Sequence, residues 1–138
     1  MKKVQVALSK VFSFSAAHRL HVPEKDQAFN QQIYDKCNNL NGHGHDYYLE
    51  ISIKGPVNTK TGMIIPLTDF DQAVEKVIAP LDHRHLDHEI DYFKNHRSTG
   101  EEIVKYLWQE LEKYLGKKLF RLKLWETNNN YFELERID

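Results

Sequence analysis

The sequence contains a single cysteine, and this scarcity excludes an internal disulfide. A chain without disulfides is typical of a reducing compartment, so the cytoplasm is the expected location. No apolar run approaches the length of a transmembrane helix. Gln5, Ser9 and Lys10 interrupt the apolar residues near the N-terminus, which is unlike the continuous apolar segment of a signal peptide. Contact with a membrane is therefore not expected.

Neither sign of charge is in excess, because 19 Lys and Arg against 20 Asp and Glu give a formal net charge of −1. A general nucleic-acid or membrane-surface binder needs a basic excess, so neither class is expected. Only 6 glycines and 4 prolines occur, and they form no linker or low-complexity tract. Residues 1–138 are therefore expected to form a single domain, which is long enough to bury a core of its own.

Four segments alternate apolar and polar residues with the period of a β-strand: residues 3–14, 47–55, 119–126 and 131–137. The first of them changes phase near Ser9 and Lys10, which predicts a β-bulge there. The last two are joined by a turn at residues 127–130. About thirty residues with little regular pattern separate the first two strands. A loop of that length usually carries function.

Residues 69–81 have the periodicity of an amphipathic helix. Asp69 is an acidic N-cap candidate, and Pro80 ends the segment. The apolar side chains that share one helical face are Phe70, Ala73, Val74, Val77 and Ile78.

Residues 98–116 carry the strongest helical pattern in the chain. Ser98 or Thr99 can cap its N-terminus, and Glu101 or Glu102 can complete a capping box. Glu101 fits that role most simply. The inward stripe consists of Ile103, Leu107, Leu111 and Leu115.

The order of elements is strand, strand, helix, helix, strand, strand. This order predicts an α+β fold in which two helices cover one face of a four-stranded antiparallel sheet. The other face would keep apolar strand positions uncovered, which favours oligomerisation.

Histidine is frequent, and His43 and His45 lie two residues apart where the second strand begins. Side chains two apart in extended chain share a face, with Cα atoms roughly 6.6 Å apart, which suits two imidazoles that bind one metal ion. His18 follows the first strand and can sit beside His43 if the two strands pair. Three imidazoles would hold Zn²⁺ with one position open. Chance proximity among 8 histidines is the alternative reading.

Cys37 lies six residues before His43, in a polar segment with Lys36 before it and Asn38 after it. A thiol beside a metal and near a cation can have a lowered pKa, which makes it a usable base or nucleophile. A buried cysteine with only a packing role is the equally weighted alternative.

Carboxylates accompany histidines elsewhere in the chain. Asp82 directly precedes His83, and a carboxylate that orients a histidine is a standard acid–base arrangement. Adjacent residues rarely face each other, however, so a charged, solvent-exposed segment after the helix is an equally good reading of this segment, which also contains His85 and His88.

Glu126 lies at the end of a strand. A carboxylate there can accept two parallel hydrogen bonds from an aminopyrimidinone ring; an exposed charge at a hairpin is the alternative.

Six separate stretches, in the same order, resemble the 6-pyruvoyltetrahydropterin synthase family. They are FSFSAAHRLH (12–21), KCNNLNGHGH (36–45), TGMIIPLTDF (61–70), PLDHRHLD (80–87), STGEE (98–102) and WETNNN (125–130). The resemblance implies the tunnelling fold, in which the sheets of three subunits close into a barrel and two trimers stack as a hexamer. It implies that a small molecule is the substrate.

The same resemblance implies roles for individual residues. His18, His43 and His45 would bind Zn²⁺, Cys37 would be the catalytic thiol, and Asp82 with His83 would be the acid–base pair, acting across a subunit interface. Glu126 would anchor the pterin ring with help from Thr99 and Glu101. Two positions depart from the family pattern: Gly100 replaces a hydroxyl residue, and Asp46 replaces an asparagine and adds a charge near the zinc shell.

The implied reaction is elimination of triphosphate from 7,8-dihydroneopterin triphosphate, a step of tetrahydrobiopterin biosynthesis. The alternative is 6-carboxy-5,6,7,8-tetrahydropterin synthase of queuosine biosynthesis, which uses the same substrate and releases acetaldehyde. A non-catalytic pterin- or metal-binding module is a third possibility. The triphosphate requires cations, and the sequence does not discriminate among Arg19, Lys36, Arg84 and Arg97.

Overall fold

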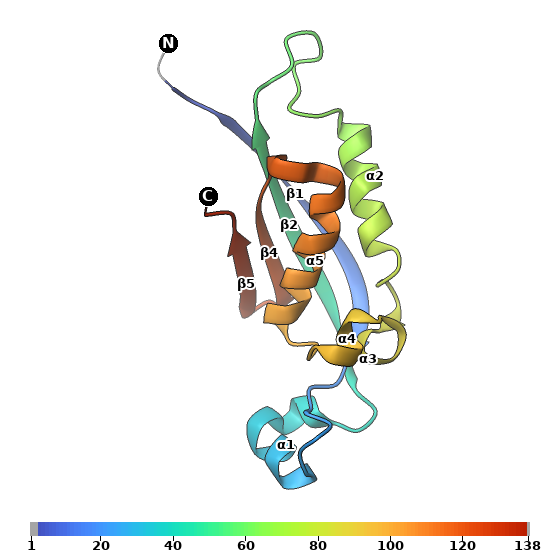
Figure 1. Cartoon of the computed structure of the whole chain (residues 1–138). Coiled ribbons are helices and arrows are strands. Elements are labelled where there is room, and N and C mark those ends of the chain that lie inside the picture. Colours follow the sequence, from blue (N-terminus) through green and yellow to red (C-terminus); the bar gives the residue numbers. More distant parts are fainter. Residues whose placement is uncertain (1–2, 138) are drawn as a thin grey trace.

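The computed structural model describes residues 3–137. Its sheet has five strands in the order β3-β1-β2-β4-β5, and α2 and α5 lie on one face of it (Figure 1). The strands are β1 (Val6–His18), β2 (His43–Gly55), β3 (Arg84–His85), β4 (Leu119–Thr127) and β5 (Asn130–Glu135). The helices are α1 (Gln27–Tyr34), α2 (Leu67–Ile78), α3 (Leu86–Glu89), α4 (Tyr92–Asn95) and α5 (Gly100–Leu115), with 3₁₀ turns η1 (Asp35–Asn38) and η2 (Gly116–Lys118).

The predicted α+β class is confirmed, but the predicted four-stranded antiparallel sheet is wrong in two details. The strands β1, β2, β4 and β5 do pair antiparallel. The fifth strand, β3, pairs parallel with β1, where Ala16 and Ala17 face Arg84 and His85. A strand of two residues has no periodicity that sequence reasoning could detect.

The predicted bulge in β1 is also wrong. Its register with β2 runs without a break from Val6 to His18. Lys10 occupies a position on the helix-covered face, and its Nζ lies 2.6 Å from Asp71 of α2. Val11 lies on the opposite face and is 57% exposed. The alternation of apolar and polar residues changes phase at this point because Lys10, a polar residue in an ion pair, occupies a position on the helix-covered face.

The two long helices cover the core as their periodicity predicts. The predicted apolar faces of α2 and α5 are buried against the sheet. Asp69 is not the N-cap, because α2 begins at Leu67 after Pro66 and places Asp69 in its first turn. Thr99 does cap α5, where its Oγ1 accepts a hydrogen bond of 3.3 Å from the Glu102 amide.

The segment between β1 and β2 is more ordered than its sequence pattern indicates. It contains α1, which lies beyond the end of the sheet (Figure 1). Asp26 caps α1 by accepting a hydrogen bond from the Phe29 amide. The buried residue of α1 is polar: Asn30, which accepts from the Val22 amide and donates to the Val22 carbonyl. A helix held by a buried amide leaves no apolar stripe in the sequence.

The second face of the sheet remains open, as expected. Val11, Tyr48 and Tyr131 lie on it and are 57%, 49% and 46% exposed. Exposed apolar side chains on neighbouring strands are typical of a surface that meets another protein chain. Over residues 3–137, no helix combines the length and apolar character needed to span a bilayer.

Gly100 is the residue that lets α5 approach β5. A Cβ atom built at Gly100 would lie 1.9 Å from Cε2 of Phe132. We expect Gly100→Ala to destabilise the fold by about 1–3 kcal/mol, as overpacking does, although alanine is the better helix former. Urea unfolding at fixed protein concentration measures this.

The matched control for this prediction is Gly100→Ala combined with Phe132→Leu. The smaller side chain removes the clash, so the double variant should recover stability relative to Gly100→Ala alone. If Gly100→Ala is as stable as the unmodified chain, the close packing of these two residues is not limiting.

Candidate metal centre and active site

Three histidines converge at the end of the sheet where β1 finishes and β2 begins. His18 pairs directly with His43 across the two strands, and Ala16 pairs with His45. Because side chains two apart share a face of a sheet, all three rings lie on the same side. Their ring centroids are 4.5 Å (His18–His43), 5.2 Å (His18–His45) and 4.8 Å (His43–His45) apart. The predicted proximity of His18 to the other two is confirmed.

The nitrogen atoms of this cluster lie close enough together to hold one metal ion. Nε2 of His18 lies 3.0 Å from Nε2 of His43, and one ligand atom from each ring lies within 4.8 Å of the others. Two nitrogens on a tetrahedral zinc ion are about 3.4 Å apart. Nδ1 of His43 and Nε2 of His45 are buried without a hydrogen-bond partner among the described residues. The donor set therefore fits a divalent ion such as Zn²⁺.

Burial favours the neutral form that a metal ligand requires at two of the three rings, His18 and His43. Burial lowers the pKa of His18 and that of His43, each below the ordinary histidine value. Nδ1 of His18 donates a hydrogen bond of 2.7 Å to the carbonyl of Ser98. Since Nδ1 carries the proton, Nε2 of His18 presents its lone pair to the other two rings.

Cys37 lies close to this cluster. It belongs to η1, and its carbonyl accepts a 2.7 Å hydrogen bond from the Leu20 amide, just past the end of β1. Cys37, His43 and His45 line one cavity of about 630 Å³. Burial raises the pKa of the Cys37 thiol, and the carboxylates of Glu126 and Asp35 raise it further. The surrounding side chains therefore favour the neutral thiol, contrary to the effect expected of Lys36.

Glu126 is not an exposed hairpin charge. Its side chain is 16% exposed, and its Oε2 lies 4.0 Å from Nε2 of His18. The contact from Asn130 Nδ2 to its other oxygen is long, at 3.5 Å. A half-buried carboxylate with weak partners beside the histidine cluster can accept hydrogen bonds from a ligand.

The other two expected ligand-binding residues lie at the start of α5. The Thr99 hydroxyl is occupied as the N-cap. Glu101 is exposed and is not the capping-box partner. The capping-box position belongs to Glu102, whose carboxylate instead accepts hydrogen bonds from Tyr92 and Lys105.

Asp82 and His83 do face each other, although they are adjacent. His83 has a φ of 61°, a left-handed conformation that is rare for residues other than glycine. Its amide donates to the Ser15 carbonyl at 2.6 Å, and the Ser15 amide donates to Oδ1 of Asp82 at 2.8 Å. This backbone turn brings Nδ1 of His83 within 3.1 Å of Oδ1 of Asp82. The pKa of the Asp82 carboxyl is lowered, mainly because it accepts this hydrogen bond from the Ser15 amide.

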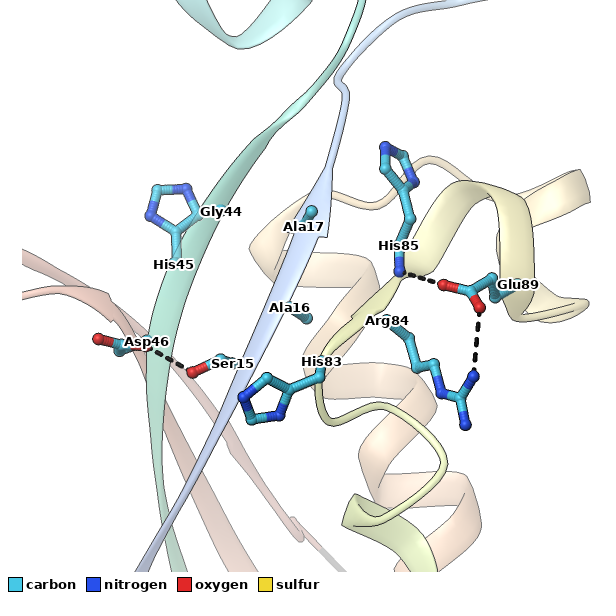
Figure 2. Close-up of a pocket in the computed structure, with 10 residues that line it drawn as sticks. All are labelled: Ser15, Ala16, Ala17, Gly44, His45, Asp46, His83, Arg84, His85 and Glu89. Carbon is cyan, nitrogen blue, oxygen red and sulfur yellow. Dashed lines mark hydrogen bonds and ion pairs between the residues drawn. The ribbon is translucent and has the colours of Figure 1, made fainter.

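His83 opens onto a second cavity, of about 570 Å³, which Figure 2 shows. His45 lines both cavities, whereas Cys37 lines only the first. The Ser15 hydroxyl donates to Asp46 at 2.5 Å on the wall of the second cavity. Asp46 follows His45 in β2 and therefore points to the opposite face of the sheet, so the expected charge in the zinc shell is not there.

The four candidate phosphate-binding residues differ in their contacts and exposure. Arg19 donates to the backbone and side chain of Asn38, and Arg97 donates to the His21 carbonyl. Arg84 contacts Glu89 at 3.4 Å and remains exposed beside His83, and Lys36 lines the cavity of Cys37. His85 and His88 stack on each other at 4.0 Å outside the three-histidine cluster.

Sequence reasoning missed Ser15 and Ser98. Ser98 was considered only as a helix cap, yet its backbone carbonyl holds His18. Backbone groups carry no residue signature, so only the packing of the chain could reveal these contacts. Together, the observations define an α+β protein with three clustered histidines that could hold a metal ion, beside a cavity that contains a thiol.

Comparisons with known proteins agree with this description. A family model for 6-pyruvoyl tetrahydropterin synthase matches residues 7–136. The chain is 41% identical to 6-pyruvoyl tetrahydrobiopterin synthase of Drosophila melanogaster over 126 residues, covering 89% of this chain and 75% of that protein. The structure of Caenorhabditis elegans 6-pyruvoyl tetrahydropterin synthase matches with a TM-score of 0.93 and 33% identity, covering 99% of each chain.

A more distant relative is 6-carboxy-5,6,7,8-tetrahydropterin synthase of Haemophilus influenzae, with 28% identity over 93% of this chain and 97% of that protein. The family model spans nearly all of the sequence. The chain therefore belongs to the 6-pyruvoyl tetrahydropterin synthase family.

Proposed function

We propose that the chain is a zinc-dependent lyase that converts 7,8-dihydroneopterin triphosphate to 6-pyruvoyltetrahydropterin and triphosphate, in tetrahydrobiopterin biosynthesis. The main support is the cavity shared by Cys37, His43 and His45, because one substrate can reach the thiol and the metal ligands there. Relatives named for this synthase activity supply the reaction class. The activity would belong to one domain over residues 1–138, and the single thiol favours a reducing, cytoplasmic setting.

Held by His18, His43 and His45, zinc would supply a Lewis acid that acidifies the side-chain hydroxyls of the substrate. Cys37 removes a proton from the substrate side chain. Its raised pKa means that the thiol first has to lose its own proton. His83 is the base for that step, because Asp82 binds its Nδ1 and leaves Nε2 free to accept a proton.

The reaction balances without a nicotinamide or a flavin. One hydroxyl-bearing carbon of the side chain is oxidised to a carbonyl while the pterin ring is reduced by the same two electrons. Elimination then breaks the carbon–oxygen bond to triphosphate, and the resulting enol gives the second carbonyl. Glu126 anchors the ring by accepting two hydrogen bonds from its amino and ring N–H groups, assisted by Thr99 and Glu101.

A complete site requires a second copy of the chain. Cys37 and His83 open onto different cavities of one chain, and one face of the sheet is open to a partner. We infer a homo-oligomer in which the Asp82–His83 pair of one subunit serves the thiol of its neighbour. A hexamer of two trimers, with the sheets of each trimer closed into a barrel, satisfies both observations.

Mixing two inactive variants tests this arrangement. Cys37→Ala and His83→Ala are each expected to lose turnover as pure proteins. When the two are unfolded together and refolded at equal amounts, about one quarter of the interfaces combine an intact Cys37 with an intact His83. Activity should return to roughly that fraction. A mixture as inactive as its components would place both residues of a working site in one subunit.

The alternative function is 6-carboxy-5,6,7,8-tetrahydropterin synthesis, which the Haemophilus influenzae relative favours. Both reactions start from 7,8-dihydroneopterin triphosphate, so the products distinguish them. The purified, zinc-loaded protein is incubated with this substrate, and the products are identified by mass. A pyruvoyl product supports the proposal, whereas acetaldehyde with a carboxylated pterin supports the alternative.

A further inference from the structure

We propose that Asp87 is a positioning residue for the metal centre and that it acts through His18. The inference assumes the zinc site proposed above. It rests on a chain of contacts that leads from this carboxylate to the buried ligand. Asp87 lies in α3, and its side chain is only 13% exposed.

The two oxygens of Asp87 hold two segments that flank the ligand. Oδ2 accepts a 2.7 Å hydrogen bond from the Arg19 amide. Oδ1 accepts a 2.8 Å hydrogen bond from the hydroxyl of Ser98. β1 ends at His18, so the amide of Arg19 lies beyond the hydrogen bonds between strands, and Asp87 is its acceptor.

The contact with Ser98 reaches the imidazole itself. The carbonyl of Ser98 accepts the Nδ1 proton of His18 at 2.7 Å, and both residues are fully buried. Asp87 therefore fixes the backbone on one side of His18 and the hydrogen-bond acceptor on the other. Groups that orient a metal-binding histidine typically contribute 10- to 100-fold to metal affinity.

Removing this carboxylate should weaken metal binding without removing a ligand. In Asp87→Ala, the Arg19 amide and the Ser98 hydroxyl lose their acceptor, and the Ser98 carbonyl can move away from His18. We expect zinc affinity to fall by about 10- to 100-fold. Asp87→Asn should bind zinc more tightly than Asp87→Ala, because an amide can accept from Arg19 and donate to Ser98.

The experiment measures zinc affinity by competition with a chromophoric chelator, and the visible spectrum of the Co²⁺-substituted protein. The decisive comparison is Asp87→Ala in the unmodified chain and in a His18→Ala background. If Asp87 acts through His18, its loss weakens binding in the first and changes little in the second. A general effect on folding would weaken binding equally in both and would overturn the proposal.

Glu102→Ala is the matched control. Glu102 also accepts two hydrogen bonds, from Tyr92 and Lys105, but these do not lead to a histidine of the cluster. It should lower the thermal midpoint and leave zinc affinity unchanged. Should Asp87→Ala not fold, Ser98→Ala tests the same chain of contacts, because it removes the hydroxyl and keeps the carbonyl.

The two proposals fail in different ways. If the unmodified chain binds no zinc, the proposed zinc enzyme is wrong and the role of Asp87 falls with it. If the unmodified chain binds zinc and Asp87→Ala, or Ser98→Ala in its place, binds it equally well, only the positioning role is wrong.

Discussion

Replacing Cys37 by alanine is expected to abolish turnover while the protein still binds zinc. The thiol lines the cavity of His43 and His45 but is not a member of the three-histidine cluster. Loss of a proton-transfer group typically costs 10²- to 10⁴-fold in rate. Product formation from 7,8-dihydroneopterin triphosphate and zinc content are measured on the same sample.

Cys37→Ser is the closest control. It keeps the size and hydrogen-bonding ability of the side chain but has a far higher pKa, so it should also be inactive. If Cys37→Ala keeps full turnover, the thiol is not the base. Bound zinc and pterin without any turnover, in the unmodified chain, would instead indicate a binding module.

Replacing His43 by alanine is expected to remove zinc and activity together. The ring of His43 lies 4.5 Å from that of His18 and 4.8 Å from that of His45, so its loss leaves only two of the three candidate ligands. A catalytic metal is worth several kcal/mol, so turnover should fall by at least roughly 100-fold. Zinc content after dialysis and the initial rate are the two measurements.

His96→Ala is the matched control for this variant. His96 is exposed, and its ring stacks on Tyr92, outside the cluster. It should keep both zinc and activity. Activity that survives in His43→Ala after its metal is removed would show that the reaction does not depend on this centre.

The clustering of the three candidate metal ligands was predictable because it depends on local periodicity and one strand pairing. The spacing of His43 and His45 places both rings on one face of an extended chain. For His18 to lie beside those two rings, β1 only had to pair with β2 in the register that places His18 opposite His43, and the structure shows this register. The apolar faces of α2 and α5 were predictable for the same reason, since a helix repeats its pattern along a single segment.

Features held by polar or backbone contacts were not predictable. The helix α1 is held by the buried amide of Asn30, which reads in the sequence as an ordinary surface residue. The inward position of Lys10 depends on Asp71, which is distant in the chain. Neither contact leaves a periodic pattern.

The sequence by itself determined the two amphipathic helices, because each depends on the spacing of residues within one segment. It also determined the α+β class from the order of the elements, and the three candidate ligands from local spacing and one pairing of strands. Only the tertiary structure decided that His83 turns back onto Asp82, that Asp87 binds Ser98 while the Ser98 carbonyl binds His18, and that Cys37 and His83 face different cavities. These features join segments that are far apart in the chain, or depend on a strained backbone that such contacts hold. Their geometry is therefore set only when the whole domain has packed.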